Sequence, residues 1–175
     1  MIRELRIEYG LMKGQDLVVL AKLFDPEARK LGYLELGGAL ALSASETHAA
    51  VKRLRECGLL DPSRAPIRRN ALEFLFSGLR YVFPFRPSGG VVRGVPTGWA
   101  APVAREAFAS DGPAPVWESP DGDAVGPAYA PLYPTVPRAA RADRGLYDRL
   151  ALFDLARGGR VREREWARRR LEELP

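Results

Sequence analysis

The sequence predicts a mostly α-helical protein with a small β component. Apolar residues recur at helical spacing near both ends of the chain, in residues 1–70 and 141–175. Between them, residues 71–140 hold 11 of the 15 prolines and several short extended runs, which indicates ordered loops and a hairpin rather than long helices. We therefore divide the chain into these three segments, and we expect each to have its own structural character.

The composition is that of a globular protein. Hydrophobic residue types make up 46% of the 175 residues, which is enough to bury a core, so intrinsic disorder is not expected. No run of about 18 apolar residues is present, and the first ten residues carry charges where a signal peptide has its apolar stretch. A single cysteine, Cys57, excludes a disulfide within the chain. These features predict a cytoplasmic protein without membrane contact.

The residue counts also weigh against metal and catalytic sites. His48 is the only histidine, and His48 together with Cys57 provides too few ligands for a tetrahedral zinc site. No phosphate-binding glycine loop, dinucleotide-binding fingerprint or HExxH motif occurs. An enzyme that used carboxylates alone would need a pocket with coupled acids, and no spacing in the sequence indicates one. We therefore expect no metal, no cofactor and no enzymatic activity.

The N-terminal segment begins with a predicted strand and a helix. Leu5, Ile7 and Tyr9 alternate with charged residues, as in a short, half-buried strand. A helix with a wide apolar face is expected to begin near Gln15 and to end before Pro26, because proline breaks a helix or restarts it at a first helical position.

Residues 33–60 place a short helix, a tight turn and a longer helix one after another. Leucines supply the apolar contacts of the first helix, and small residues among them allow the two helices to approach closely. The turn is expected near residues 41–43. Ser43 or Ser45 can cap the second helix, and Ser43 with Glu46 has the spacing of a capping box.

The second helix has two contrasting faces. The face expected to pack inward consists of Thr47, Ala50, Val51 and Leu54. The opposite face is small, hydrogen-bonding or cationic, and consists of Ala44, Ser45, His48, Ala49, Lys52, Arg53 and Arg55. Such a helix can enter the major groove of DNA, because its small residues allow close approach while its polar and cationic residues meet base edges and phosphates.

Leucines, glycines and small residues stand at set positions in this segment: Leu36-Gly37, Leu40-Ala41-Leu42-Ser43, Leu54 and Gly58-Leu59-Leu60. The pattern resembles the helix-turn-helix of bacterial winged-helix transcription regulators of the MarR-like kind. Gly37 replaces the usual alanine, Ala41 replaces the usual turn glycine, and Thr47 stands where valine or isoleucine is common. Ala41 therefore implies a strained or wider turn. The resemblance implies a winged helix-turn-helix core with its recognition helix at about residues 43–57.

In that family a β-hairpin, the wing, follows the recognition helix and touches the minor groove or the DNA backbone. The corresponding residues of this chain, 61–69, are short and include Arg64, Arg68 and Arg69. They form either a stub wing that places these arginines on phosphates or a plain loop.

The middle segment is expected to be ordered and rich in loops. Apolar spacing predicts a helix over residues 72–79, with Asn70 as its cap. The extended runs that follow are residues 91–95, 114–119 and 124–133. Turn-forming residues at 119–123 predict a hairpin between the last two runs. Trp99 and Trp117 are expected to lie in the core rather than to form a ligand platform.

The C-terminal segment predicts two helices separated by Gly158-Gly159, which is a stop signal. Apolar residues recur at helical spacing from Leu146 to Ala156 in the first helix. The second is strongly amphipathic and carries three consecutive arginines, residues 168–170. We expect these helices to pack on the rest of the chain or to form a dimer interface.

Together these features predict a sequence-specific DNA-binding transcription regulator that binds double-stranded DNA as a homodimer. Ser43 and the backbone amides after it would anchor a phosphate, the middle of the recognition helix would meet base edges, and the arginines would bind the DNA backbone. The expected DNA-binding residues are Ser43, Ala44, Ser45, His48, Ala49, Lys52, Arg53, Arg55, Arg64, Arg68 and Arg69.

The alternative is a protein-interaction module, such as the antitoxin of a toxin–antitoxin pair. In that case the Pro-rich, aromatic middle segment would hold the partner. The two functions can coexist, since an antitoxin can repress its own operon. The net charge of +5 is modest for a DNA-binding protein, so affinity would depend on where the cations lie and on dimerisation.

Overall fold

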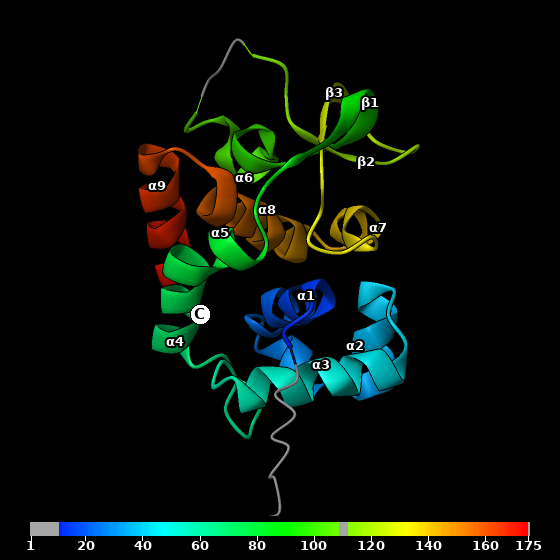
Figure 1. Ribbon diagram of the computed structural model, residues 1–175. Coiled ribbons are helices and arrows are strands. Elements are labelled where there is room, and N and C mark those ends of the chain that lie inside the picture. The colour runs from blue at the N-terminus through cyan, green and yellow to red at the C-terminus, as the bar shows by residue number, and fades with distance from the viewer. Residues whose placement is uncertain (1–10, 109–111, 175) are drawn as a thin grey trace, which may run out of the picture.

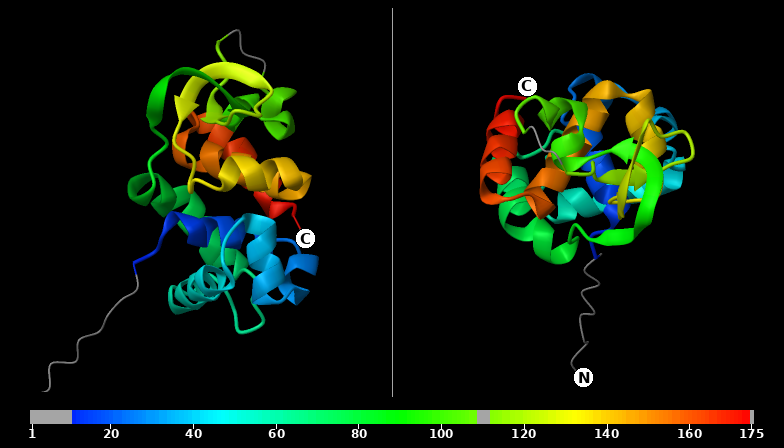
Figure 2. Two further views of the ribbon diagram at one scale, coloured as in Figure 1. Left: turned by 90° about the vertical axis from the view of Figure 1, so that its right-hand side faces the viewer. Right: turned by 90° about the horizontal axis from the view of Figure 1, so that it is seen from above.

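The computed structural model describes residues 11–108 and 112–174 (Figure 1). It is mostly helical with a small three-stranded sheet, which confirms the predicted fold class at that level. The N-terminal helices lie at one end of the molecule and the sheet at the other, with the C-terminal helices between them (Figures 1 and 2). The strand predicted at residues 5–9 lies outside the described residues.

Three N-terminal helices pack together: α1 (Gly14–Leu23), α2 (Tyr33–Leu40) and α3 (Ala44–Glu56). Both α1 and α2 contact α3, and a short 3-10 helix, η1 (Glu27–Lys30), lies between α1 and α2 in the chain. Most of α1 is buried, because α3 covers it on one side and the C-terminal helix α8 (Arg144–Gly158) on another. The helix, the turn and the longer helix predicted from the sequence are all confirmed.

The turn between α2 and α3 is built as its sequence predicts. Ala41 has φ 56° and ψ 40°, a left-handed conformation that glycine adopts more easily than alanine. Ser43 then caps α3, since its Oγ accepts a hydrogen bond from the Glu46 N–H at 3.1 Å. The Glu46 carboxylate accepts one from the Ser43 N–H at 2.9 Å. The strained turn and the capping box are therefore both present.

Two residues that depart from the MarR-like pattern, Gly37 and Thr47, lie against each other. A Cβ on residue 37 would lie 2.7 Å from Thr47 Oγ1 and 2.8 Å from the Leu42 carbonyl oxygen, so no side chain fits there without a shift. Thr47 is fully buried, and its hydroxyl donates to the Ser43 carbonyl at 2.9 Å. The missing Cβ of Gly37 thus leaves the space that this buried hydroxyl needs.

Replacing Ala41 with glycine is expected to raise the free energy of unfolding by up to about 1 kcal/mol. The left-handed conformation costs alanine roughly 1–2 kcal/mol, and the greater backbone entropy that glycine loses on folding offsets part of the gain. Urea unfolding measures the change. The control is Ala39→Gly at an exposed helical position of α2, which is expected to lose about 1 kcal/mol. A destabilised Ala41→Gly variant would argue against strain in this turn.

A longer helical segment follows, in three parts: α4 (Arg68–Glu73), a π-helical turn η2 (Phe74–Gly78) and α5 (Leu79–Val82). The helix predicted over residues 72–79 is present, but the prediction that Asn70 caps it is wrong. The helix begins earlier than predicted, at Arg68. Its first turn is polar, so the apolar spacing gave no sign of it. Asn70 Nδ2 instead donates to the Gly58 carbonyl just after α3, at 2.8 Å.

The sheet contains the three extended runs predicted from the sequence: β1 (Pro87–Pro96), β2 (Val116–Glu118) and β3 (Ala124–Tyr129). The predicted hairpin between the last two is wrong. Both β2 and β3 run antiparallel to β1, so they are parallel to each other and pair at Val116 and Ala128.

The turn between β2 and β3 explains this arrangement. Its amide at Gly122 donates to the Ser119 carbonyl at 3.0 Å, so the expected turn does form. However, Gly94 of β1 is paired with Glu118 on one side and with Ala124 on the other. The turn therefore carries the chain past β1. Gly122 and Gly94 allow this close passage, since a Cβ on Gly122 would lie 2.1 Å from the Gly94 carbonyl carbon.

The remaining helices surround α8. They are η3 (Gly98–Ala100), α6 (Pro102–Arg105), α7 (Val136–Ala142) and α9 (Val161–Glu172). Helix α8 contacts elements from all three sequence segments, among them α1, α5 and α9, and most of its residues are buried. One apolar core therefore runs through the whole chain, and the three segments share it. Trp117 lies within this core, as expected, whereas Trp99 is half-buried at its edge.

Candidate nucleic-acid interface

The outward face of α3 carries the polar row predicted from the sequence. Ser45, His48, Lys52 and Arg55 are exposed, and Ala49 is half-buried. The opposite face holds the helix against α1 and α2, since Thr47, Ala50, Val51 and Leu54 are buried. Helix α3 lies at the end of the molecule far from the sheet (Figure 1). The exposed row is therefore accessible along the length of the helix.

Two of the exposed side chains have weak local partners. The His48 ring packs edge-on against Tyr33, with ring centroids 4.9 Å apart. Lys52 Nζ lies 3.8 Å from the Glu56 carboxylate, and both side chains are more than half exposed. Such surface pairs contribute little to stability, so both residues can exchange their partners for a ligand at small cost. Arg55 donates to the Pro62 carbonyl at 2.7 Å and keeps its other N–H groups free to bind.

Arg53 faces inward, which removes it from the expected DNA-binding residues. Its guanidinium donates to both carboxylate oxygens of Asp16, at 2.8 and 2.6 Å. The hydrogen bond to Asp16 raises the pKa of Arg53 above its ordinary value. Asp16 is fully buried and also accepts from the Lys13 N–H at 2.8 Å. This two-point ion pair joins α1 to α3 and sets the position of α3.

Ser43 is not free to anchor a phosphate. Its N–H and its hydroxyl both donate to Glu46 Oε2, at 2.9 and 2.7 Å. The hydrogen bonds from Ser43 lower the pKa of Glu46, so its carboxylate occupies the anion position at the start of α3. The expected role of Ser43 is therefore corrected, because it caps the helix. Ala44, in the same turn, is half-buried.

The segment after α3 is a short bridged loop. Leu60 and Pro66 form an isolated antiparallel bridge, and the Ile67 N–H donates to the Leu59 carbonyl at 2.9 Å. At its tip, Asp61 accepts hydrogen bonds from Ser63 and from the Ala65 N–H, and the bond from Ser63 lowers the pKa of Asp61. These residues form a loop closed by a single isolated bridge and belong to no strand.

Two of the three arginines in and after this loop face the protein rather than solvent. Arg64 donates to the carbonyls of Leu31, at 2.9 Å, and of Arg29. Arg68 donates to three carbonyls at the C-terminal end of α9, that of Glu172 at 2.7 Å. Their expected phosphate contacts are therefore corrected, because both side chains cap backbone carbonyls of this chain. Arg69 is exposed and remains a candidate.

A buried polar centre beside the sheet was not predicted. Asp154, on α8, is 1% exposed and accepts hydrogen bonds from Thr97, Trp117 and Arg157 at 2.7–2.8 Å. Arg157 also donates to backbone carbonyls, including that of Ala130 at 2.7 Å. The i,i+3 spacing of Asp154 and Arg157 is the only sequence signal for it, and the same spacing is common on helix surfaces.

Comparison with protein-family models, with curated proteins and with solved structures gives no match for this chain. In the parts of the chain that the structure describes, no helix is both long and apolar enough to cross a membrane. Within residues 11–108 and 112–174, no group of three His, Cys, Asp or Glu side chains is placed to hold a metal ion. The functional argument therefore rests on the geometry of α3 and its surroundings.

Proposed function

We propose that this protein is a DNA-binding transcription regulator that reads double-stranded DNA with the outward face of α3. The proposal rests on the contrast between the two faces of this helix. Its inner face and Arg53 are held by the rest of the chain, while Ser45, His48, Lys52 and Arg55 are presented to solvent. A rigidly held helix with an exposed polar row suits insertion into a major groove.

The exposed residues form two groups, according to the part of the DNA that each can contact. Ser45, His48 and Ala49 occupy the first half of the helix, where small or hydrogen-bonding side chains can meet base edges. Lys52, Arg55 and Arg69 lie further along the chain and suit contacts with phosphates. Sequence specificity is thus assigned to the N-terminal half of α3, and affinity to the three cations that follow it in the chain.

A homodimer is part of this proposal. Three cations per chain make a small electrostatic footprint, and a second copy would double the phosphate contacts on a two-fold symmetric site. Helix α8 is buried within its own chain, so it does not supply the dimer contacts. Helix α9 also packs on its own chain, through Ala167 and Leu171.

Fluorescence anisotropy with labelled duplexes tests the proposal. One duplex is taken from upstream of the protein's own gene, and a scrambled duplex of equal length is its comparison. The double variant Lys52→Ala/Arg55→Ala is expected to bind either duplex about tenfold more weakly or worse, with a shallower salt dependence. His48→Ala is expected to cost about 1–3 kcal/mol of discrimination at one base pair while leaving non-specific binding unchanged.

The control is Arg168→Ala/Arg169→Ala, which removes two exposed cations from α9. It is expected to keep the affinity of the wild-type protein. Equal losses of DNA affinity in the α3 and α9 variants would indicate non-specific attraction by net charge. Unchanged binding in the α3 variant would refute the assignment of this face.

A protein-interaction module, such as an antitoxin, is the second proposal. It is favoured by two exposed valines in the sheet, Val91 at 71% and Val125 at 59% exposed. The strand register places them on the same face, since Val91 pairs with Pro127 and Arg93 pairs with Val125. A Val91→Ser/Val125→Ser variant would lose such a partner and keep DNA binding, which separates the two proposals.

A further inference from the structure

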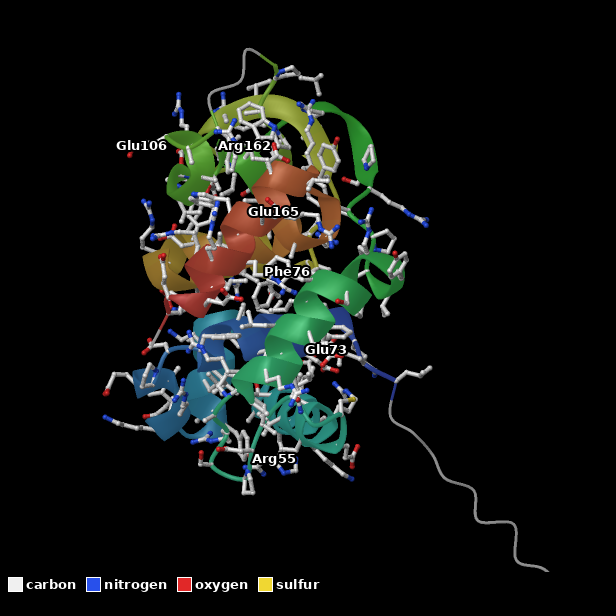
Figure 3. The ribbon with its side chains drawn as sticks, turned by 90° about the vertical axis from the view of Figure 1, so that its left-hand side faces the viewer. Arg55, Glu73, Phe76, Glu106, Arg162 and Glu165 are labelled. Atoms are coloured by element: carbon white, nitrogen blue, oxygen red, sulfur yellow. The ribbon has the colours of Figure 1, made fainter. Side chains whose placement is uncertain are left out.

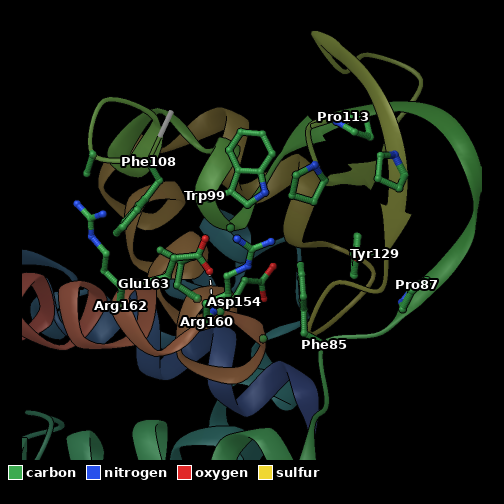
Figure 4. Close-up of a pocket in the computed structure, with 17 residues that line it drawn as sticks. Phe85, Pro87, Trp99, Phe108, Pro113, Tyr129, Asp154, Arg160, Arg162 and Glu163 are labelled. Carbon is green, nitrogen blue, oxygen red and sulfur yellow. Dashed lines mark hydrogen bonds between the residues drawn. The ribbon is translucent and has the colours of Figure 1, made fainter. Parts of the chain in front are cut away.

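A cavity of about 700 Å³ opens between the sheet, η3, the residues that follow α6 and the junction of α8 with α9 (Figure 4). It is far from α3, because Arg162 beside the cavity and Arg55 on α3 lie at opposite ends of the molecule (Figure 3). Cavities of this size hold small molecules of the size of a cofactor or a drug. No residue of this cavity takes part in the proposed DNA contacts.

Aromatic rings form the two sides of the cavity. Trp99 and Phe108 lie on one side, and Phe85 and Tyr129 lie on the other (Figure 4). The rings of Phe85 and Tyr129 are stacked, with centroids 4.3 Å apart and planes within 10° of parallel. The Phe108 ring packs edge-on against Trp166 at 5.3 Å. These contacts fix the orientation of the rings, which lowers the entropic cost of packing a ligand against this side of the cavity.

Two arginines stand at one edge of the cavity. Arg160 and Arg162, at the start of α9, are exposed, and neither forms an ion pair with a described carboxylate. The Arg162 guanidinium lies 5.9 Å from the centre of the Phe108 ring. Glu163 is the nearest acid in the chain, and its carboxylate accepts the Arg160 N–H at 2.7 Å. These two guanidinium groups are therefore available to an anion.

Two acids lie among the lining residues, Asp154 and Glu163, and the charge of Asp154 is already neutralised. Asp154 is held by Arg157, Thr97 and Trp117 and is 1% exposed. Arg157 in turn lies over the Phe85 ring, 5.1 Å from its centre, and supports that side of the cavity. Outside this pair, Arg160 and Arg162 outnumber Glu163 by one charge, so the rest of the site is net positive.

We propose that this cavity binds a flat aromatic small molecule that carries an anionic group. The ring system would lie between the aromatic sides, and the carboxylate or phosphate would be held by Arg160 and Arg162. Guanidinium groups favour both anions, because their planar fork matches either one with two hydrogen bonds. The site gives this chain a ligand-binding function separate from the face of α3.

Isothermal titration calorimetry of the full chain with four probes tests the proposal. The two anionic probes are indole-3-acetate and adenosine monophosphate, and their neutral counterparts are indole-3-ethanol and adenosine. At least one anionic probe is expected to bind with a Kd of about 100 μM or tighter, and its neutral counterpart about tenfold more weakly or worse. The pair with the larger ratio of anionic to neutral affinity shows whether the site favours a carboxylate or a phosphate.

The double variant Arg160→Gln/Arg162→Gln is expected to bind the anionic probe about tenfold more weakly and to bind the neutral probe with unchanged affinity. Arg169→Gln, an exposed arginine of the same helix away from the cavity, is the matched control and is expected to bind like the wild-type protein. Equal affinity for charged and neutral probes would overturn the proposal, as would equal losses in both variants. No binding of either anion at about 1 mM would also overturn it.

Discussion

Replacing Asp154 with asparagine is expected to lower the free energy of unfolding by about 3–5 kcal/mol. Asparagine has nearly the same shape but no charge, so Arg157, which is 5% exposed, would remain buried without its counter-ion. The new amide N–H₂ would also face donors, because Asp154 accepts from Thr97 and Trp117 as well. Urea unfolding measures the loss as a lower midpoint at an unchanged slope.

Asp148→Asn on the same helix is the control for this prediction. Asp148 pairs with Arg144 at 2.9 Å, and their side chains are 30% and 63% exposed. Its loss is expected to cost no more than about 1 kcal/mol. If Asp154→Asn fails to fold, Thr97→Val removes a single donor and is expected to cost about 1–3 kcal/mol. An Asp154→Asn variant as stable as the wild-type protein would show that the buried centre contributes nothing to the fold.

Replacing Arg53 with alanine is expected to cost about 3 kcal/mol or more of stability. The variant leaves the Asp16 carboxylate, which is 0% exposed, without the two hydrogen bonds that Arg53 donates. Water cannot replace these bonds at a site with no exposure, so the penalty of a buried, unpaired charge remains. Thermal or urea unfolding detects the loss without any DNA present.

The neighbouring Lys52→Ala variant is the control. Lys52 is exposed, and its only ion pair with a described residue is with Glu56 at 3.8 Å, so stability is expected to change by less than about 1 kcal/mol. Adjacent residues of one helix are thus expected to differ in role, since Arg53 supports the fold and Lys52 is a proposed DNA contact. A double variant of both residues would confuse unfolding with loss of binding. An Arg53→Ala variant with normal stability and weakened DNA binding would reverse these assignments.

Local structure could be predicted from the sequence because short-range rules determine it. The turn at Ala41, the cap at Ser43 and the buried face of α3 each follow from residues within one or two helical turns. The extended runs of the middle segment were found for the same reason. These features fix the bounds of α3 and the residues of its exposed row.

The roles of individual arginines could not be predicted, because their partners are distant in the sequence. Arg53 pairs with a residue 37 positions away, and Arg68 donates to a carbonyl 103 positions away. Nothing in a run of cations distinguishes one that faces solvent from one that caps a neighbouring helix. Sequence reasoning therefore names Lys52 and Arg53 alike, and only the packing of α1 on α3 separates them.

The order of the strands was missed for a similar reason. A turn between two extended runs usually joins a hairpin, but here both runs pair with β1. The passage of the chain past β1 depends on the contact of Gly122 with Gly94, which are 28 positions apart. The cavity beside the sheet follows from the same long-range packing, so its aromatic sides were not foreseen as a site.

Mapping by ¹H–¹⁵N NMR tests most directly whether the outward face of α3 meets DNA. A short duplex is titrated into labelled protein, and the change in each backbone amide signal is recorded. The largest changes are expected at Ser45, His48, Ala49, Lys52 and Arg55, with small changes in α9 and beside the cavity. Changes concentrated in α9, or none at saturating duplex, would contradict the proposal that α3 is the DNA-binding helix.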